Sequence, residues 1–238
     1  MTRPGEIPPP DHHRDVNGGW LRPAVFGAMD GLVSNVGLIS GVGGGGAAVS
    51  VVVVAGFAGL VAGAISMALG EYTSVKSQAE QVEAELAMER RELERNPEGE
   101  RAELAQLWID RGLSPELAHQ VATEVHRNPE EALRLHAREE LGVEPGEQPS
   151  AWTAAISSFA FFSLGALVPI LPYLLGGREL WMALAAGGLG LFLAGALVAR
   201  FTNRRWWLSG ARQLALGATA AGVTWIIGRL IGDVAGSL

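Results

Sequence analysis

Long apolar stretches dominate the pattern of hydrophobic and polar positions along this chain. Each is about 20 residues or longer, is rich in Ala, Gly, Leu and Val, and carries little charge; the five stretches are 24–44, 47–70, 151–175, 180–200 and 212–236. A helix of about 20 apolar residues crosses the roughly 30 Å hydrocarbon core of a bilayer. The pattern therefore predicts an all-α, polytopic membrane protein with five transmembrane helices.

A polar segment, 71–148, interrupts this pattern between the second and third predicted spans. It holds 19 of the 25 acidic side chains but only 9 of the 18 basic ones. Pro97 ends a helix that continues from the second span, and Gly112 ends the next helix, over 98–111. Ser114-Pro115 and Asn128-Pro129 begin two further helices, because a capping side chain followed by proline is a typical helix start. We therefore expect a helical acidic domain inserted between the second and third spans.

The predicted organisation has four parts. They are a disordered tail (1–21), the first two spans (22–70), the acidic domain (71–148) and the last three spans (149–238). The arginines that flank the predicted spans gather on one side of the membrane, and they are Arg14, Arg22, Arg200, Arg204, Arg205 and Arg212. Because positive residues concentrate in cytoplasmic loops, we expect the N-terminus and residues 71–148 in the cytosol and the C-terminus outside.

Two features of the composition restrict the chemistry. The chain has no cysteine, which excludes disulfides, iron–sulfur clusters and thiolate ligands. It also has no G-x-x-x-x-G-K-[ST] loop, which argues against ATP-driven pumping, and no nucleophile–base constellation. We expect neither an enzyme nor a prosthetic group, and any metal ion must be held by oxygen, imidazole or thioether ligands.

The helix that follows the second span carries an acidic edge. Its apolar stripe places Glu89 at the position between Leu86 and Leu93 where an apolar residue is expected, and Glu85, Glu89 and Glu92 follow an i, i+4, i+7 spacing. Like charges so spaced cost a helix about 0.2–0.5 kcal/mol per pair. A bound cation removes this cost, although a solvated acidic face remains the alternative.

Two further pairs add candidate ligands. Glu100 and Glu103 lie at i, i+3, and His136 and Glu140 at i, i+4. Carboxylates with an imidazole suit Fe²⁺, Mn²⁺ or Zn²⁺ better than Ca²⁺. A single E-x-x-H match, Glu116 with His119, does not suffice for a di-iron bundle, which needs two.

The apolar stretches contain three candidates for a transport pathway. Asp30 lies about a third of the way into the first span, where an ionisable group is expensive and typical of ion pathways or proton relays. Met67, in the second span, offers a thioether that favours iron over magnesium or calcium. Glu71, at the cytosolic end of that span, is either an entrance ligand or a surface charge.

Several motifs in this order resemble the vacuolar iron transporter family of proton-coupled Fe²⁺ and Mn²⁺ carriers. The motifs are Asp30-Gly31-Leu32, Ser66-Met67-Ala68-Leu69-Gly70-Glu71-Tyr72, Asn128-Pro129, Glu140-Leu141-Gly142 and the broken helix 165–173. The resemblance implies five spans, a homodimer and a cytosolic metal-binding domain. It also implies metal ligation by Glu89, Glu92, Glu100, Glu103 and Glu140, and a pathway through Asp30 and Met67. Where the family can have two methionines, this chain has His136 and Ala137.

The resulting hypothesis is a proton-coupled antiporter that exports Fe²⁺ from the cytosol, in a bacterial cytoplasmic membrane. We expect lipid, divalent metal ions, protons and a second copy of the chain as partners, and no nucleic acid. Three alternatives stay open: an exporter that prefers Mn²⁺, a membrane-anchored iron oxidase or store, and a scaffold that does not transport.

Overall fold

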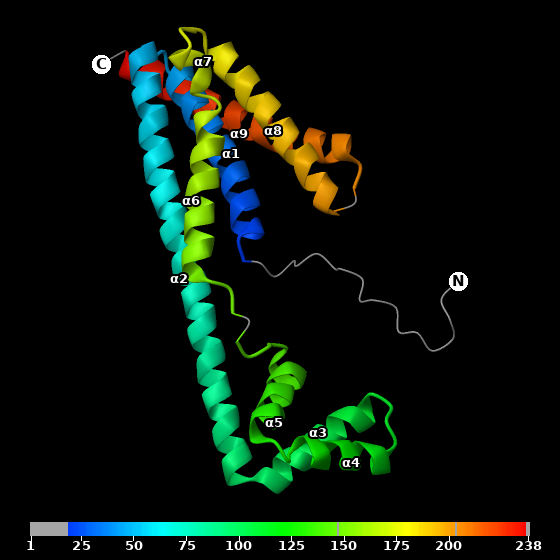
Figure 1. Ribbon diagram of the computed structural model, residues 1–238. Helices are drawn as coiled ribbons and strands as arrows, with labels where there is room; N and C mark the ends of the chain where they lie inside the picture. The colour runs from blue at the N-terminus through cyan, green and yellow to red at the C-terminus, as the bar shows by residue number, and fades with distance from the viewer. Residues whose placement is uncertain (1–18, 147, 203, 237–238) are drawn as a thin grey trace. The chain divides into compact units, whose positions relative to one another are not determined.

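The computed structural model describes residues 19–146, 148–202 and 204–236, in which all regular structure is helical (Figure 1). In chain order the elements are α1 (Leu21–Gly44), α2 (Val49–Arg95), α3 (Pro97–Asp110), α4 (Pro115–Val125), α5 (Pro129–His136), the π-helical turn η1 (Ala137–Leu141), α6 (Ala151–Leu167), α7 (Leu171–Leu174), α8 (Leu180–Thr202) and α9 (Trp206–Ala235). The all-α prediction is therefore confirmed for the described residues.

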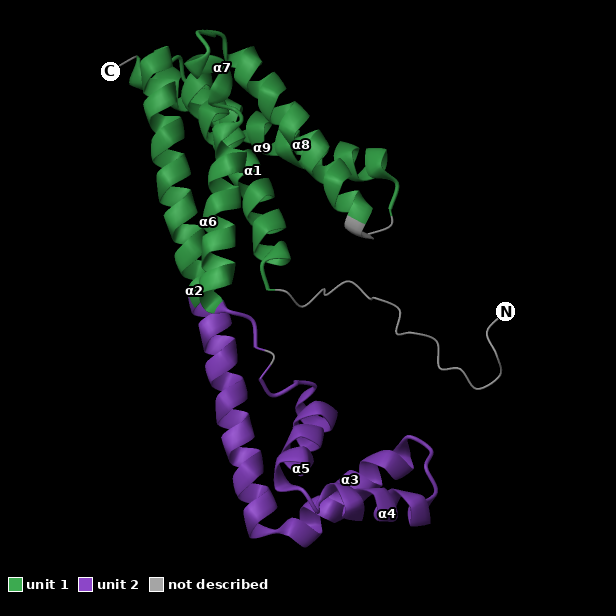
Figure 2. Ribbon diagram, viewed as in Figure 1, with its two compact units in different colours: residues 1–72, 151–238 green, residues 73–150 purple. Residues whose placement is uncertain are grey.

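Two compact units make up the chain (Figure 2). Unit 1 comprises residues 1–72 and 151–238, and unit 2 comprises residues 73–150. The predicted tail falls almost wholly on residues 1–18, with His12 and His13, and lies outside the described residues.

Four of the described helices are long and apolar enough to cross a membrane: Leu21–Gly44, Val49–Arg95, Leu180–Arg200 and Trp206–Ala235. They correspond to four of the five predicted spans. The remaining predicted span, 151–175, is broken. The 17-residue helix α6 ends at Leu167, and a turn that contains Pro169 leads into the four-residue helix α7. Proline has no backbone N–H and disfavours a helical residue before it, which accounts for the break.

The boundaries of the last helix differ from the prediction. We expected a loop up to Arg212, but α9 already begins at Trp206, with Arg205 at its N-cap. No proline or glycine precedes Gly210 in this segment, so the helix can begin six residues earlier. Arg212 thus lies inside a helix, whereas Arg204 and Arg205 remain in the connection.

Glycines let α1 and α6 of unit 1 approach closely. A Cβ on Gly31 would collide with the carbonyl oxygen of Phe162, and a Cβ on Gly165 with that of Ala28. Small residues at such crossings are typical of membrane helices, because lipid gives no hydrophobic gain for association and close van der Waals packing must supply the stability.

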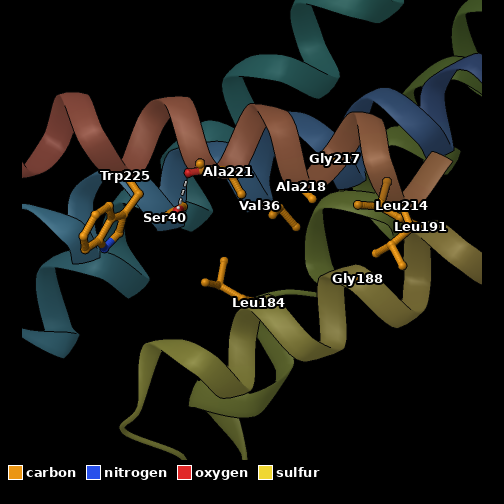
Figure 3. A pocket seen from close by; sticks show the side chains of 11 residues that line it. Val36, Ser40, Leu184, Gly188, Leu191, Leu214, Gly217, Ala218, Ala221 and Trp225 are labelled. Carbon is orange, nitrogen blue, oxygen red and sulfur yellow. Dashed lines mark hydrogen bonds between the residues drawn. The ribbon is translucent and has the colours of Figure 1, made fainter. Parts of the chain in front are cut away.

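Unit 1 also contains a largely apolar pocket of about 460 Å³ between α1, α8 and α9 (Figure 3). Ser40 and Trp225 carry the polar side-chain atoms of its lining, and the Ser40 hydroxyl donates to the carbonyl of Ala221 at 2.8 Å. The lining offers no carboxylate, imidazole or thioether. This pocket is therefore not a candidate metal site.

The helix starts predicted for unit 2 at Ser114-Pro115 and Asn128-Pro129 are confirmed, and α3 begins at Pro97, one residue before the predicted residue 98. Asn96, Ser114 and Asn128 cap α3, α4 and α5, and each side chain accepts a hydrogen bond from a backbone N–H of the first turn. A small core of Leu104, Ala105, Ala118 and Ala122 joins α3 to α4. Gly142 follows the π-helical turn η1 as its C-cap and has a left-handed backbone.

Candidate metal centre

The C-terminal part of α2 turns one carboxylate inward. Glu89 is only 7% exposed, whereas its helix neighbours Met88 and Arg90 are exposed. This is the position at which the apolar stripe predicts a buried residue, so the periodicity of the helix explains the burial. A buried carboxylate is costly unless it is paired or bound to a cation.

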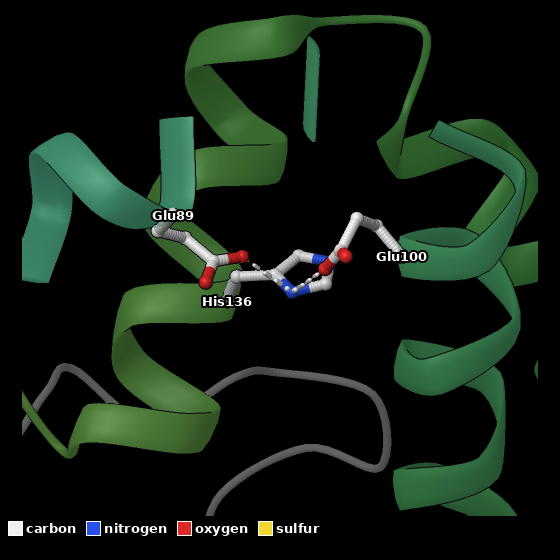
Figure 4. A group of neighbouring side chains, drawn as sticks. All are labelled: Glu89, Glu100 and His136. Atoms are coloured by element: carbon white, nitrogen blue, oxygen red, sulfur yellow. Dashed lines mark ion pairs between the residues drawn. The ribbon is translucent and has the colours of Figure 1, made fainter. Parts of the chain in front are cut away.

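His136 lies opposite Glu89 and is fully buried. Its Nδ1 is 3.0 Å from Oε1 of Glu89 and 3.9 Å from Oε2 of Glu100 (Figure 4). The same nitrogen is 2.8 Å from Oε1 of Glu140. One ligand atom each from Glu89, Glu100 and His136 lie within 4.8 Å of one another. Helices α2, α3 and α5 and the turn η1 thus bring three carboxylates and an imidazole together.

A π-helical turn shapes one side of this cluster. His136 ends α5, and η1 follows at once, from Ala137 to Leu141. Single π-helical turns occur frequently at functional sites. Here the turn carries Glu140, which contacts His136.

The electrostatics of the cluster favour a bound cation. Burial raises the pKa of Glu89 to about 7, and the neighbouring charges of Glu140, Glu100, Glu92 and Glu103 add to this shift. The pKa values of Glu100 and Glu140 are likewise raised, first by burial and then by other carboxylates. Burial lowers the pKa of His136, so its imidazole is held neutral. A divalent ion would relieve both the desolvation and the repulsion.

The six residues predicted as ligands thus divide into two groups. Glu89, Glu100, Glu140 and His136 form the contacts described above. Glu92 and Glu103 are exposed on α2 and α3 and act on the cluster through their charge. Their role as ligands stays a prediction for all six. Glu116 and His119 are both exposed on α4.

One residue at this site was not predicted. His126 follows α4 as its C-cap, and its ring packs edge-on against that of His136, with centroids 5.3 Å apart and planes at 85°. Its Nδ1 is 2.8 Å from the carbonyl oxygen of Ala122. This contact cannot be predicted from residue spacing within one helix, because the break at Asn128 and Pro129 places His126 at the end of α4 and His136 in α5.

The three predicted pathway residues lie on α1 and α2 and have different immediate surroundings. The hydroxyl of Ser34 donates to Oδ1 of Asp30 at 3.1 Å, within α1. Met67, on α2, packs against the cluster of Ala64, Phe162 and Ala166. Glu71, one turn further along α2, is half-buried. Their common role in transport stays a prediction.

Comparison with known proteins identifies the family. The model of the VIT family matches residues 21–229. A vacuolar iron transporter of Acanthamoeba castellanii is 40% identical over 189 residues, which cover 75% of this chain and 69% of the relative. Vacuolar iron transporter 1 of Oryza sativa is 32% identical over 220 residues, which cover 90% of this chain and 87% of the relative. Vacuolar iron transporter 1 of Arabidopsis thaliana is 30% identical over 227 residues, which cover 93% of this chain and 91% of the relative. These relatives are named as transporters and not as enzymes, and the chain belongs to the VIT family.

Proposed function

We propose that this chain transports Fe²⁺ across a membrane in exchange for protons and that unit 2 captures the ion. The family and the names of the relatives support iron transport. The observation that carries the capture step is the convergence of Glu89, Glu100 and Glu140 on the buried His136.

The donor set suits a divalent transition metal. Three carboxylates supply the negative charge that a divalent ion needs, and the imidazole favours iron or zinc over magnesium and calcium. Burial raises the pKa of Glu89 to about 7, so binding an ion near neutral pH displaces a proton from this carboxyl group; the pKa values of Glu100 and Glu140 are raised as well. The cluster can therefore load and unload an ion under mild changes of pH.

Asp30, Met67 and Glu71 are the residues that we assign to the transport path. Asp30 is the acidic residue of α1, an apolar helix long enough to span the membrane. An ionisable group at such a place marks an ion or proton route in many membrane proteins. In this proposal a carboxylate at Asp30 takes up a proton as the metal ion leaves it.

The orientation and assembly belong to the same proposal. Unit 2 faces the cytosol, the broken α6–α7 segment completes five spans, and two copies form the transporter. The flanking arginines support the orientation. Only 6% of the most apolar 18-residue stretch of α9 is buried. The rest of this stretch is available to lipid and to a second copy.

Two other functions are weaker candidates. A preference for Mn²⁺ would follow if the carboxylates alone determined selectivity, because oxygen ligands suit manganese. An iron oxidase or store would need a bridged di-iron centre, and the exposed pair of Glu116 and His119 offers no part of one at the buried cluster.

Flux into proteoliposomes under an imposed pH gradient tests the transport proposal. We expect Fe²⁺ flux that depends on the gradient and is lost in Asp30→Asn, with unchanged metal binding by the purified variant. Asp233→Asn is the matched control, because Asp233 is an acidic residue at the exposed end of α9. Equal flux in both variants would remove Asp30 from the path, and no flux in the native chain would overturn transport itself.

A further inference from the structure

His126 and His136 form a pair of imidazoles whose outer nitrogens have no partner. The Nε2 atoms of both rings are buried and accept or donate no hydrogen bond among the described residues. Buried polar atoms are nearly always satisfied in folded proteins, and an unsatisfied one costs about 1–3 kcal/mol. Both atoms are therefore open to a ligand that the described residues do not supply.

The hydrogen bonds of the two rings determine which nitrogen is free. A carbonyl oxygen can only accept, so Nδ1 of His126 must carry the proton that it donates to Ala122, and Nε2 then holds a lone pair in the neutral ring. Nδ1 of His136 is 2.8 Å from Oε1 of Glu140 and, because a carboxylate only accepts, donates its proton to it; Oε1 of Glu89 lies 3.0 Å from the same nitrogen. Its Nε2 is then also a lone-pair nitrogen.

This is the arrangement of metal-binding histidines in general. A histidine that binds a metal through one nitrogen donates the other N–H to a backbone carbonyl or a carboxylate, which fixes its tautomer and orientation. His126 has the carbonyl version of this support and His136 the carboxylate version. Glu140 thereby orients the imidazole, while Oε1 of Glu89 has no hydrogen-bond partner among the described residues and stays available for an ion.

The spacing of the rings also fits a shared ion. Two imidazoles bound through nitrogen to one tetrahedral ion have ring centroids about 5 Å apart, given metal–nitrogen bonds of about 2.0–2.1 Å. The two rings have centroids 5.3 Å apart and are nearly perpendicular. The charge of Arg101 opposes a cation at His126; one terminal nitrogen of its guanidinium pairs with Glu98 at 3.3 Å, whereas its Nε has no partner among the described residues.

We propose that Nε2 of His126 and Nε2 of His136 together form a nitrogen-ligand position for a borderline transition-metal ion beside the carboxylates of the capture site. This inference rests on the proposed function and deepens it, because it specifies the ion class. Imidazole suits Fe²⁺ and Zn²⁺, whereas carboxylate and water suit Mn²⁺ and Mg²⁺. The nitrogen position therefore biases capture toward iron over manganese.

Metal titration of the full chain in detergent, with Zn²⁺ and Mn²⁺ as probes, tests this proposal. The variant is His126→Gln, and the matched control is His119→Gln, which changes the exposed histidine of the same helix. We expect His126→Gln to lower the Zn²⁺ affinity at least about 10-fold, because loss of a residue that only supports a ligand already costs about 10–100-fold, and to leave the Mn²⁺ affinity within about 2-fold. His119→Gln should change neither.

Each other outcome overturns the proposal. Unchanged Zn²⁺ affinity in His126→Gln would mean that His126 is no ligand, and an equal fall for both ions would mean that it only supports the fold of unit 2. Failure of the capture site itself has a different signature. In that case the native chain would bind Mn²⁺ no better than a Glu89→Gln, Glu100→Gln double variant.

Discussion

Oε1 of Glu89 lies 3.0 Å from Nδ1 of His136, and both side chains are buried although the residues belong to α2 and α5. The contact joins the C-terminal part of α2 to α5 within unit 2. Because the partners are an acid with a raised pKa and a neutral imidazole, the contact is sensitive to both protons and metal ions. It therefore combines a structural role in unit 2 with the proposed capture of an ion.

Replacing Glu89 by Gln should separate these two roles. The variant removes a charge that Glu140, Glu100, Glu92 and Glu103 repel, so we expect the metal-free protein to gain about 1 kcal/mol above neutral pH, from a few repulsions of about 0.2–0.5 kcal/mol each. Stabilisation by added Mn²⁺ should fall strongly. Thermal unfolding with and without Mn²⁺ measures both effects.

Glu94→Gln is the control for that experiment, since Glu94 is an exposed carboxylate on the same helix. It should change neither quantity appreciably. If Glu89→Gln destabilised the metal-free protein, the carboxylate would be a structural partner of His136 and not a strained ligand.

Metal binding should release protons, and more of them at about pH 6.5 than at about pH 8. The pKa of Glu89 is raised from 4.5 to about 7 in the folded protein, so the acid is largely protonated below 7 and an ion must displace that proton. Affinity should consequently fall as the pH decreases through 7. Calorimetry at one pH in buffers of different protonation enthalpy counts the protons, and a count that does not vary with pH would contradict the shift.

The same pKa predicts how stability depends on pH without metal. The folded protein keeps the Glu89 proton between pH 4.5 and 7 while the unfolded chain loses it, so this contribution is complete below 4.5 and is lost as the pH rises through 7. The lowered pKa values of His126 and His136 act in the opposite sense: their contribution is present above 6.5 and is lost at more acidic pH. We therefore expect the denaturation midpoint to fall between pH 7 and pH 8. A rise over this interval would contradict the assignment.

Most of the fold could be predicted from the hydrophobic periodicity of the helices and from the residues that begin or end them. The caps at Asn96, Ser114 and Asn128 are local in sequence, and Glu89 was recognised because it interrupts an apolar stripe. The start of α9 at Trp206 was missed because a charged segment without a breaker can be helical as well as looped. His126 was missed because its contact with His136 depends on how α4 and α5 pack, which no spacing within one helix encodes.

The buried contact, and not the exposed ion pair beside it, should join α2 to α5. Arg90 and Glu130 also pair between these helices, at 3.2 Å, but both side chains are exposed, and exposed pairs contribute at most about 1 kcal/mol. Arg90→Ala should therefore have a small effect on thermal stability. His136→Ala should cost about 2–4 kcal/mol, because it opens a cavity at a fully buried side chain and leaves Oε1 of Glu140 without its donor. Equal losses in the two variants would show that the surface pair matters as much.

The close crossing of α1 and α6 should be intolerant of a single methyl group. In Gly165→Ala the new Cβ would meet the carbonyl oxygen of Ala28, which belongs to a helix backbone and cannot rotate away. Overpacking of this kind costs about 1–3 kcal/mol. Gly70→Ala makes the same chemical change in α2 with no other atom within 4 Å, so it should be neutral or stabilising by up to about 1 kcal/mol. Thermal unfolding in detergent compares the two variants.

The same substitution should also reduce Fe²⁺ flux, because Asp30 follows Ala28 by two residues on α1 and a separation of α1 from α6 would displace it. If the stability and flux of Gly165→Ala equalled those of Gly70→Ala, the crossing of α1 and α6 would be loose.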